Sequence, residues 1–323
     1  MKKIVLASVL GCVLGATFFA GCGGGESAGD AGDKLQIAVI PKGTTHSFWK
    51  TIHAGAEKAA EELDVEIIWQ GPQKEDDREM QIQVVQNFIS RGVDAIVLAP
   101  LDDRALVKPV EAAVKRGITV IIIDSSLQSE EYASFVATDN YEGGRQCAKR
   151  LAAVMGNAGR ALMLRYMEGS ASTNKREQGF LEGIAEFGPE IELVSINQYA
   201  GATMNEAFES AQNLLNRYSA VDGVFCPNES STQGMLRALQ TAGRAGKVKF
   251  VGFDNNDTLI GALEAGEING LALQNPFKMG YEGVQAAVAA VNGEDVVRRI
   301  DTGVVMVTPE NLQDEEILEL LSR

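Results

Sequence analysis

The sequence predicts an α/β fold that consists of two similar, doubly wound lobes. From residue 35 onward, short apolar segments alternate with segments whose apolar residues recur at helical spacing. Many of the short segments are nearly continuous runs of Val, Ile and Leu, which is typical of parallel strands covered by helices on both faces. The length of 323 residues also exceeds one average domain and suggests about two.

The first residues are predicted to be an export signal rather than part of the fold. Two lysines precede an apolar stretch over residues 4–20, and small residues follow it. A charged start, an apolar stretch and a small residue before the cleavage point are the pattern of a secretory signal. An uncleaved membrane anchor is the alternative interpretation of the same stretch.

The end of this stretch favours a lipoprotein. Residues 19–22 (FAGC) resemble a bacterial lipobox, in which the Cys is acylated and becomes the new N-terminus. Residues 1–21 are therefore expected to be a lipoprotein signal peptide, with Cys22 as the lipidated residue. Residues 22–34 are Gly-rich, small and acidic, the composition of a flexible tether. A soluble body held at a membrane outside the cytoplasm follows from this prediction.

The expected elements follow in order along the chain. A helix over 47–63 is predicted because its apolar residues share one face: Phe48, Trp49, Ile52, Ala56, Ala59, Ala60 and Leu63. A second helix over 76–91 would be capped by Asp76 or Asp77 and would turn these residues inward: Met80, Val84, Val85, Phe88 and Ile89. Strands are predicted over 35–40, 65–69, 95–99, 118–123, 161–165, 192–197, 223–226, 249–253 and 269–274.

A weak internal repeat agrees with two lobes. Residues 93–100 (VDAIVLAP) recur in outline as residues 221–228 (VDGVFCPN), each after an expected helix and before a polar loop. Eight positions of loose likeness carry little weight alone, but the repeat agrees with the length of the chain.

Composition excludes several classes of function. The 29 basic and 44 acidic residues give a net charge of −15, and without a basic cluster such a surface repels nucleic acid. The two histidines, His46 and His53, leave little room for a His-based zinc site or a hydrolase triad. No metal or cofactor is therefore expected. Cys147 and Cys226 fall in an expected helix and strand, which favours two free core thiols over a disulfide.

The candidate binding residues are those that follow the strands. In open parallel sheets, ligands bind beyond the carboxyl ends of the strands. Carboxylates, amides, aromatic rings and few cations occupy these positions, and such groups suit the paired hydroxyls and C–H faces of a neutral polyhydroxylated ligand. A phosphate-binding Gly-rich loop is absent from this sequence. The candidates from these segments are Lys42, His46, Phe48, Trp49, Asp124, Ser125, Asn228, Asp254 and Gln274.

Several of these residues also have a purely structural interpretation. Asn228 and Asp254 could cap the helices that follow them, and His46 could be a solvated loop residue. Of Phe48 and Trp49, one is expected to face the ligand and the other the core. Asp124 ends an apolar strand, where an unpartnered carboxylate would be costly to bury.

The chain from about residue 35 to 301 resembles periplasmic sugar-binding proteins of the ribose-binding type, the solute receptors of ABC importers. This resemblance rests on several segments in the same order: 48–49 (FW), 120–124 (VIIID), 137–140 (ATDN) with 143–144 (GG), 176–180 (REQGF), Asn228, 235–243 (MLRALQTAG), 251–254 (VGFD) and Gln274. It implies the type I periplasmic binding protein fold, in which the chain crosses three times between two lobes that close on a ligand.

The resemblance also implies a domain division and site residues. The N-terminal lobe would comprise 35–138 plus 275–301, and the C-terminal lobe 139–274 plus 302–323. It adds Asn140 and Arg176 to the candidates above, with Asn174 as a weaker addition. Ribose receptors carry Arg at the position of Ser125 and Asn at that of His46, and losing a fork-shaped donor changes which hydroxyl pattern is satisfied. The expected ligand is therefore another pentose, a hexose or a polyol rather than ribose.

The expected function is binding rather than catalysis. The resemblance implies a monomeric receptor that delivers its solute to an ABC permease and its ATPase, in the periplasm or at the cell surface. A receptor that serves a chemoreceptor or sensor kinase, and an extracellular glycosidase, are the alternatives. A LacI-type regulator shares this body but needs a DNA-reading helix-turn-helix, where this chain has its signal.

Overall fold

The computed structural model describes residues 34–322, which form two α/β lobes. The predicted signal peptide over 1–21, Cys22 and nearly all of the tether over 22–34 lie outside the described residues. Each lobe has one six-stranded sheet with helices on both faces. The predicted fold class is confirmed.

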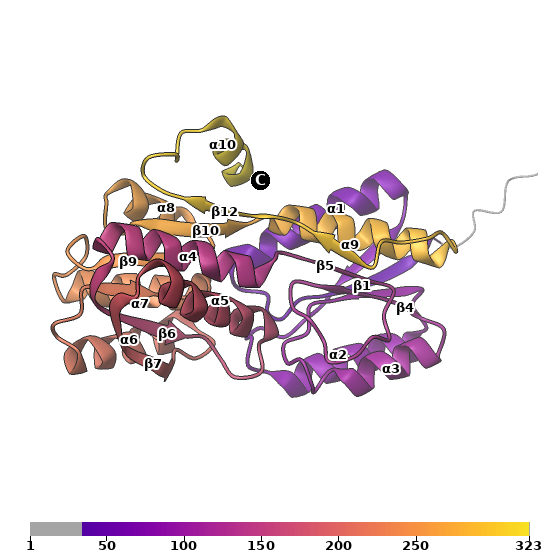
Figure 1. Ribbon diagram of the computed structural model, residues 1–323. Coiled ribbons are helices and arrows are strands. Elements are labelled where there is room, and N and C mark those ends of the chain that lie inside the picture. Colours follow the sequence, from indigo (N-terminus) through magenta and orange to yellow (C-terminus); the bar gives the residue numbers. More distant parts are fainter. Residues whose placement is uncertain (1–33, 323) are drawn as a thin grey trace, which may run out of the picture. The chain divides into compact units, whose positions relative to one another are not determined.

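The sheet of the N-terminal lobe is parallel throughout, in the strand order β11-β5-β4-β3-β1-β2. Its side chains alternate between two cores, so that Ile37 and Val39 face one set of helices and Ala38 and Ile40 the other. Helices α1 and α9 cover one face and α2 and α3 the other (Figure 1). The strands are β1 (Gln36–Ile40), β2 (Glu66–Trp69), β3 (Ala95–Leu98), β4 (Thr119–Ile123), β5 (Ser134–Ala137) and β11 (Arg299–Asp301), and the helices are α1 (Ser47–Leu63), α2 (Arg78–Arg91), α3 (Val107–Lys115) and α9 (Pro276–Val291).

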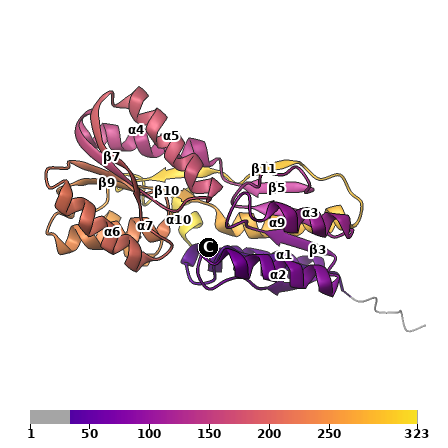
Figure 2. The same cartoon turned by 90° about the horizontal axis from the view of Figure 1, so that it is seen from below.

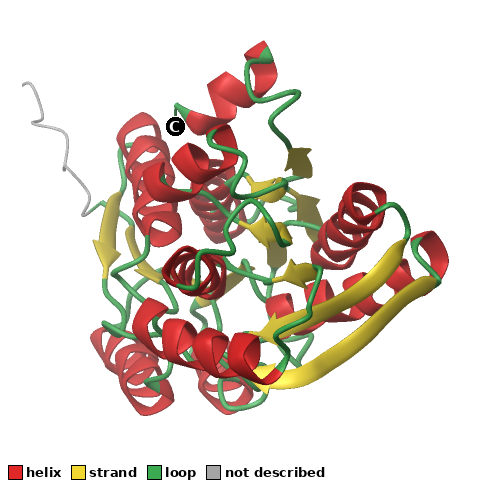
Figure 3. Ribbon diagram, turned by 90° about the vertical axis from the view of Figure 1, so that its left-hand side faces the viewer, coloured by secondary structure: helices red, strands yellow, loops and turns green. Residues whose placement is uncertain are grey.

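The sheet of the C-terminal lobe repeats this arrangement in the order β12-β10-β9-β8-β6-β7, with β12 antiparallel at one edge. Helices α4 and α5 cover one face, and α6, α7 and α8 the other. Strands β6 and β7 form the long ribbon in Figure 3. The strands are β6 (Ala158–Arg165), β7 (Glu190–Tyr199), β8 (Gly223–Phe225), β9 (Lys249–Phe253), β10 (Gly270–Gln274) and β12 (Val304–Val307), and the helices are α4 (Asn140–Met155), α5 (Ala171–Phe187), α6 (Met204–Arg217), α7 (Glu229–Thr241), α8 (Asp257–Glu264) and α10 (Glu315–Leu321).

The chain passes between the two sheets three times. It leaves β5 for α4, returns from β10 to α9, and leaves β11 for β12. Figure 2 shows β11 beside β5, far along the chain from the rest of the first sheet. The last crossing is held by Thr138, whose hydroxyl donates to the carbonyl of Gly303 at 3.1 Å.

In each lobe two helices pack with their backbones in close contact. A Cβ atom added to Gly55 in α1 would lie 2.0 Å from the carbonyl oxygen of Phe277 in α9. A Cβ atom added to Gly144 in α4 would lie equally close to the carbonyl oxygen of Arg176 in α5. Only glycine permits this approach, so α4 fixes the position of α5 and of Arg176 with it.

The nine predicted strands and the two predicted helices are present with local differences, whereas β5, β11 and β12 were not predicted. Met80 is 44% exposed, not inward as predicted, because α2 buries Gln81, Val84, Val85 and Phe88 instead. The side chain of Gln81 donates to the carbonyl oxygens of Pro41 and Ala99, which makes a buried amide favourable there. Leu63, at the last turn of α1, is 37% exposed rather than buried.

Two further predictions concern cysteines and the membrane. Cys147 in α4 and Cys226 after β8 are buried and free, as expected for core thiols. Within residues 34–322 no helix has the length and apolar character needed to span a membrane.

Candidate functional site

The carboxyl ends of strands from both sheets surround a small cavity between the lobes, of about 30 Å³. Its lining is mostly polar, nearly half of its residues can carry a charge, and Phe48, Trp49 and Tyr166 add aromatic rings. The lining residues are Lys42, His46, Phe48, Trp49, Glu75, Asp124, Tyr166, Ser170, Ser172, Thr173, Arg176, Asn228, Glu229, Asp254 and Gln274.

An aspartate stands at the end of the same strand in each sheet. Asp124 follows β4 and Asp254 follows β9, and both have left-handed backbone, with φ of 59° and 67°. The amide of Asp124 donates to Val136 in the next strand, and that of Asp254 donates to Ala272. The two turns are therefore equivalent, and each brings a carboxylate to the cavity from its own lobe.

Asp124 pairs with a buried lysine. The Nζ atom of Lys42, after β1, lies 2.7 Å from Asp124 Oδ2, and both side chains are 4% exposed. The same Nζ donates to Ser172 Oγ of the C-terminal lobe at 3.1 Å. A buried carboxylate requires such a partner, and here the partner also joins the two lobes.

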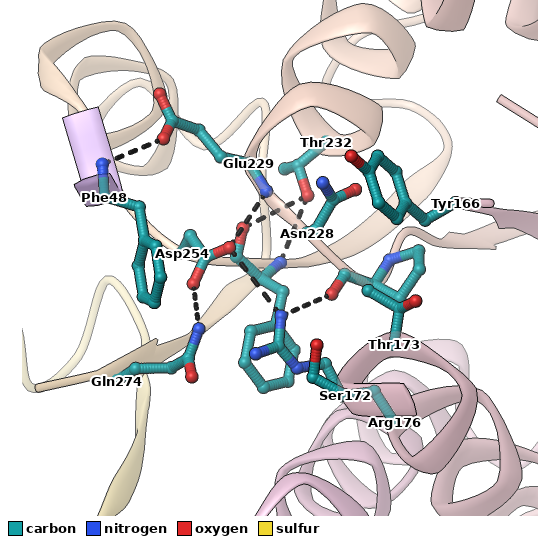
Figure 4. Close-up of polar contacts among 12 residues, drawn as sticks. Phe48, Tyr166, Ser172, Thr173, Arg176, Asn228, Glu229, Thr232, Asp254 and Gln274 are labelled. Atoms are coloured by element: carbon teal, nitrogen blue, oxygen red, sulfur yellow. Dashed lines mark hydrogen bonds and ion pairs between the residues drawn. The ribbon is translucent and has the colours of Figure 1, made fainter. Parts of the chain in front are cut away.

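Asp254 is held mainly by uncharged hydrogen-bond donors, whereas Asp124 is paired with a lysine (Figure 4). Its Oδ1 accepts from Gln274 Nε2 at 2.7 Å, and its Oδ2 accepts from the amide of Glu229 at 3.0 Å. Burial raises the pKa of Asp254 to about 6, and the positive charge of Arg176, 3.8 Å away, only partly opposes this. The carboxylate is held by donors on one side and faces the cavity on the other.

Arg176, on α5, is 2% exposed and is fixed by three contacts. Its Nε donates to Asn140 Oδ1 at 2.7 Å, and its Nη1 donates to the carbonyl of Pro227 at 3.0 Å. The guanidinium carbon lies 4.0 Å from the ring centre of Phe253. Its Nη2 has no partner among the described residues, 34–322, so this donor is available to a ligand.

Glu75, on the loop between β2 and α2, contacts three side chains. It accepts from Trp49 Nε1 and from the hydroxyl of Tyr166, each at 2.8 Å, and lies 2.5 Å from His46 Nδ1. Burial lowers the pKa of His46, but the nearby carboxylates, Glu75 foremost, raise it to about 9. For Glu75, burial acts in the opposite direction and raises the pKa, but the nearby positive charges of His46 and Lys42 lower it to about 2. Both groups of this pair are therefore charged at neutral pH.

The two adjacent aromatic residues of α1 both line the cavity. Trp49 is 2% exposed and its indole nitrogen is committed to Glu75. Phe48 packs edge-on against Trp49, with ring centres 4.9 Å apart, and is half-buried. The α1 amides of Ser47 and Phe48 donate to the carboxylate of Glu229 on the opposite lobe, at 3.4 and 3.2 Å.

Three buried polar atoms at the cavity have no partner within residues 34–322: Ser170 Oγ, Arg176 Nη2 and Gln274 Oε1. Buried polar groups are nearly always paired, so each exception needs a physical reason. Two of these atoms can donate and two can accept. A ligand rich in hydroxyl groups would satisfy all three.

The structure brings nine of the twelve predicted ligand-binding residues to the cavity wall. Two others stand directly behind it: Ser125 accepts from the amide of Ser172 at 3.0 Å, and Asn140 supports Arg176. Asn174 lies elsewhere, in a separate hollow with Arg165. It precedes Arg176 by two positions, which is about 200° around a helix, so the two side chains cannot share a face.

Six lining residues were not among the candidates. Tyr166 follows β6 directly, and the strand-end rule applied to that strand would have found it. Glu229 follows Asn228 and has the sequence signal of an ordinary first-turn acid. Glu75 follows no strand, and no sequence signal marks it. The remaining three, on the loop before α5 and in its first turn, are Ser170, Ser172 and Thr173.

The arrangement supports binding through hydrogen bonds and stacking. Among residues 34–322, no three His, Cys, Asp or Glu side chains come together as a metal site. Asn228 is a helix cap, as its structural interpretation held, because its Oδ1 accepts from the amide of Ser231 at 3.3 Å. It also lines the cavity, so the two roles coexist.

The fold and the cavity between two lobes define a binding protein that holds a small polar ligand. Residues 37–295 match the family described as "Periplasmic binding protein domain", and the chain belongs to this family. The predicted resemblance is thereby confirmed.

Individual relatives agree. The chain is 29% identical to the D-ribose/D-allose-binding protein of Pseudomonas aeruginosa, over 81% of this chain and 84% of the relative. It is 28% identical to the ribose import binding protein RbsB of Escherichia coli, over 86% of this chain and 92% of the relative. A carbohydrate transporter solute binding protein from Agrobacterium radiobacter, solved in complex with D-arabinose, superimposes with a TM-score of 0.86 at 34% identity, over 89% of this chain and 98% of that chain. All three are named as binding proteins, two of them of import or transport systems, which confirms the prediction of a binding protein rather than an enzyme.

Proposed function

We propose that this chain is an extracytoplasmic, lipid-anchored solute receptor that binds a neutral sugar or polyol between its lobes and delivers it to an ABC importer. The observation that carries the proposal is the set of unpartnered buried atoms at the cavity, contributed by Ser170, Arg176 and Gln274. Family membership supports the transport role.

The roles of the residues follow from their remaining hydrogen-bonding capacity. Asp124 and Asp254 accept hydrogen bonds from ligand hydroxyl groups, and Arg176 and Lys42 donate hydrogen bonds to ligand oxygens. Gln274 accepts a further hydrogen bond through its unpartnered Oε1. Phe48 covers the C–H face of the ligand. Cations and carboxylates are closely balanced along the cavity wall, so an uncharged ligand adds no unpaired charge.

Ligand entry requires the lobes to separate. A cavity of about 30 Å³ has room for a few water molecules at most, and contacts such as that of Lys42 with Ser172 close it. We place the lobes at 35–138 plus 275–301 and 139–274 plus 302–323, with hinges at the three crossings. The ligand shifts this equilibrium by its greater affinity for the closed state.

A thermal-shift screen tests the proposal. The probes are pentoses, hexoses, polyols and cyclitols, with D-ribose, D-allose and D-arabinose among them. A ligand at 100 times its Kd adds about 2.7 kcal/mol to the free energy of unfolding, which raises Tm by several degrees. A neutral sugar or polyol that raises Tm supports the proposal, and a screen in which only charged solutes do so contradicts it.

The anchor and the route of delivery have their own tests. Mass spectrometry of the mature protein should show an acylated Cys22 at the N-terminus, and an unmodified Cys22 would refute the anchor. We expect a monomeric receptor that meets a permease and its ATPase at the membrane. Uptake of the labelled ligand should disappear when the gene for the chain is deleted and should return with the wild-type gene.

A further inference from the structure

The buried carboxylate of Glu75 joins the two lobes. Its Oε1 is 2.8 Å from Trp49 Nε1 and 2.5 Å from His46 Nδ1, both at the start of α1. Its Oε2 accepts from the hydroxyl of Tyr166 at 2.8 Å, and Tyr166 follows β6 of the other lobe. Separation of the lobes would break the bond to Tyr166 and leave the bonds to α1 intact.

The pairing with Glu75 decides what His46 offers to the cavity that it lines. Because Nδ1 faces a carboxylate, it holds a proton. The charge of the ring then depends on whether the other nitrogen, Nε2, is protonated too. Nε2 of a neutral ring would accept a hydrogen bond, whereas Nε2 of an imidazolium can only donate. The charge of the ring therefore sets which kind of ligand atom it can meet.

The charges around His46 favour the imidazolium. Three carboxylates face it, those of Glu75, Glu229 and Asp254, and each raises the pKa of His46 against the effect of burial. Lys42 lines the same cavity, acts on Glu75 and is paired with Asp124. Glu75 is the only one of the three carboxylates in direct contact with the ring.

We propose that Glu75 is a positioning residue that holds His46 as a hydrogen-bond donor toward the ligand and couples this state to lobe contact through Tyr166. The inference deepens the proposed function and rests on it. It assigns the ligand an oxygen acceptor, a hydroxyl or a ring oxygen, opposite His46. A cationic group is excluded from that position by like charge.

Titration by NMR tests the first half without any ligand. The chain has two histidines, so ¹³C-labelled His gives two ring signals, which a His53→Gln variant assigns. His46 should titrate near pH 9 in the wild type, and about 1–3 pH units lower in Glu75→Gln. Glu79→Gln removes the same charge from an exposed position on α2 and should leave the signal unchanged. A wild-type His46 that titrates at or below pH 6.5 would overturn the proposal, whether or not the variant folds.

Calorimetry at several pH values tests the second half, with D-ribose, D-allose and D-arabinose as probes. The affinity of the wild type should be constant between pH 7 and 8, because His46 stays charged and Asp254, with a pKa of about 6, is ionised throughout this range. The affinity of Glu75→Gln should fall about tenfold or more as pH rises through the lowered His46 titration. An equal loss at every pH would mean a structural role alone and would refute the proposal. If no probe binds the wild type, the choice of ligand class fails, and the NMR titration still decides the role of Glu75.

Tyr166→Phe separates lobe contact from the charge of His46. Loss of the hydroxyl removes the bond across the lobes but no charge. The His46 titration should be unchanged, whereas small-angle scattering of the unliganded protein should show a larger radius of gyration than in the wild type. An unchanged radius would refute the coupling.

Discussion

Replacing Asp254 with Asn should make the unliganded protein more stable and a poorer binder. Asn has the shape of Asp without its charge, and the surroundings can accommodate it. Its oxygen can accept from the amide of Glu229, as Asp254 Oδ2 does. Its amide nitrogen can donate to Gln274 Oε1 once the Gln274 amide turns over, and in the wild type this oxygen has no partner in the part of the chain that the structure describes.

The magnitude follows from the raised pKa of Asp254. Burial moves it from 3.8 to about 6, and each pH unit corresponds to about 1.4 kcal/mol, so ionisation in the folded state costs about 3 kcal/mol. The folded state holds this proton between pH 4 and 6 while the unfolded state releases it. Wild-type stability therefore falls by that amount as pH rises through this window. The Asn variant has no such group, so its advantage should grow from near zero at pH 4 to about 3 kcal/mol at pH 8.

Urea unfolding at pH 4 and pH 8 measures this difference. Asp257→Asn, an exposed position on α8, is the matched control for the loss of one charge. Calorimetry with the best ligand should show Asp254→Asn weaker by about 1–3 kcal/mol, because a carboxylate acceptor is lost. A stability difference that does not change between the two pH values would refute the assignment of a strained, buried carboxylate at this position.

Two further predictions concern the packing of the C-terminal lobe. Gly144→Ala should lower the free energy of unfolding by about 1–3 kcal/mol and weaken ligand binding, because the new Cβ would meet the Arg176 carbonyl. The new Cβ of Gly261→Ala in α8 would meet open space. This variant should raise the free energy of unfolding by about 1 kcal/mol in the same urea titration. Cys147 and Cys226, both fully buried, should resist iodoacetamide in the native protein and react in urea, as peptide mass mapping would show. Labelling of either thiol under native conditions would contradict the buried core described here.

The fold could be predicted because its signals are local and repeated. A short run of apolar residues identifies a strand such as β4, and apolar residues at helical spacing identify a helix such as α1. The strand-end rule singled out Asp124 and Asp254, which both line the cavity, because an acidic residue directly after a buried strand lies at the edge of the sheet where ligands bind. The buried face of a helix was predicted less well where a polar side chain takes a core position, as Gln81 does in α2 while Met80 is exposed.

The rest of the site depends on contacts that a linear pattern does not contain. Glu75 reaches the cavity from a loop, and its three partners come from α1 and from the far lobe. The carboxylate of Glu229 bonds to the first amides of α1 across the lobes, although its position in α7 predicts an ordinary first-turn acid. Pairing over such sequence distances is set by how the two sheets meet.

The left-handed turns at Asp124 and Asp254 restrict how the binding preference of this receptor can diverge. Side chains other than Gly, Asn and Asp are strained in that backbone conformation, so few substitutions are open at either turn. Neighbours in ordinary conformations, such as Ser125 and Ser172, carry no such restriction. New ligand preferences should therefore arise by exchange of those neighbours, while the paired acids persist as a fixed frame.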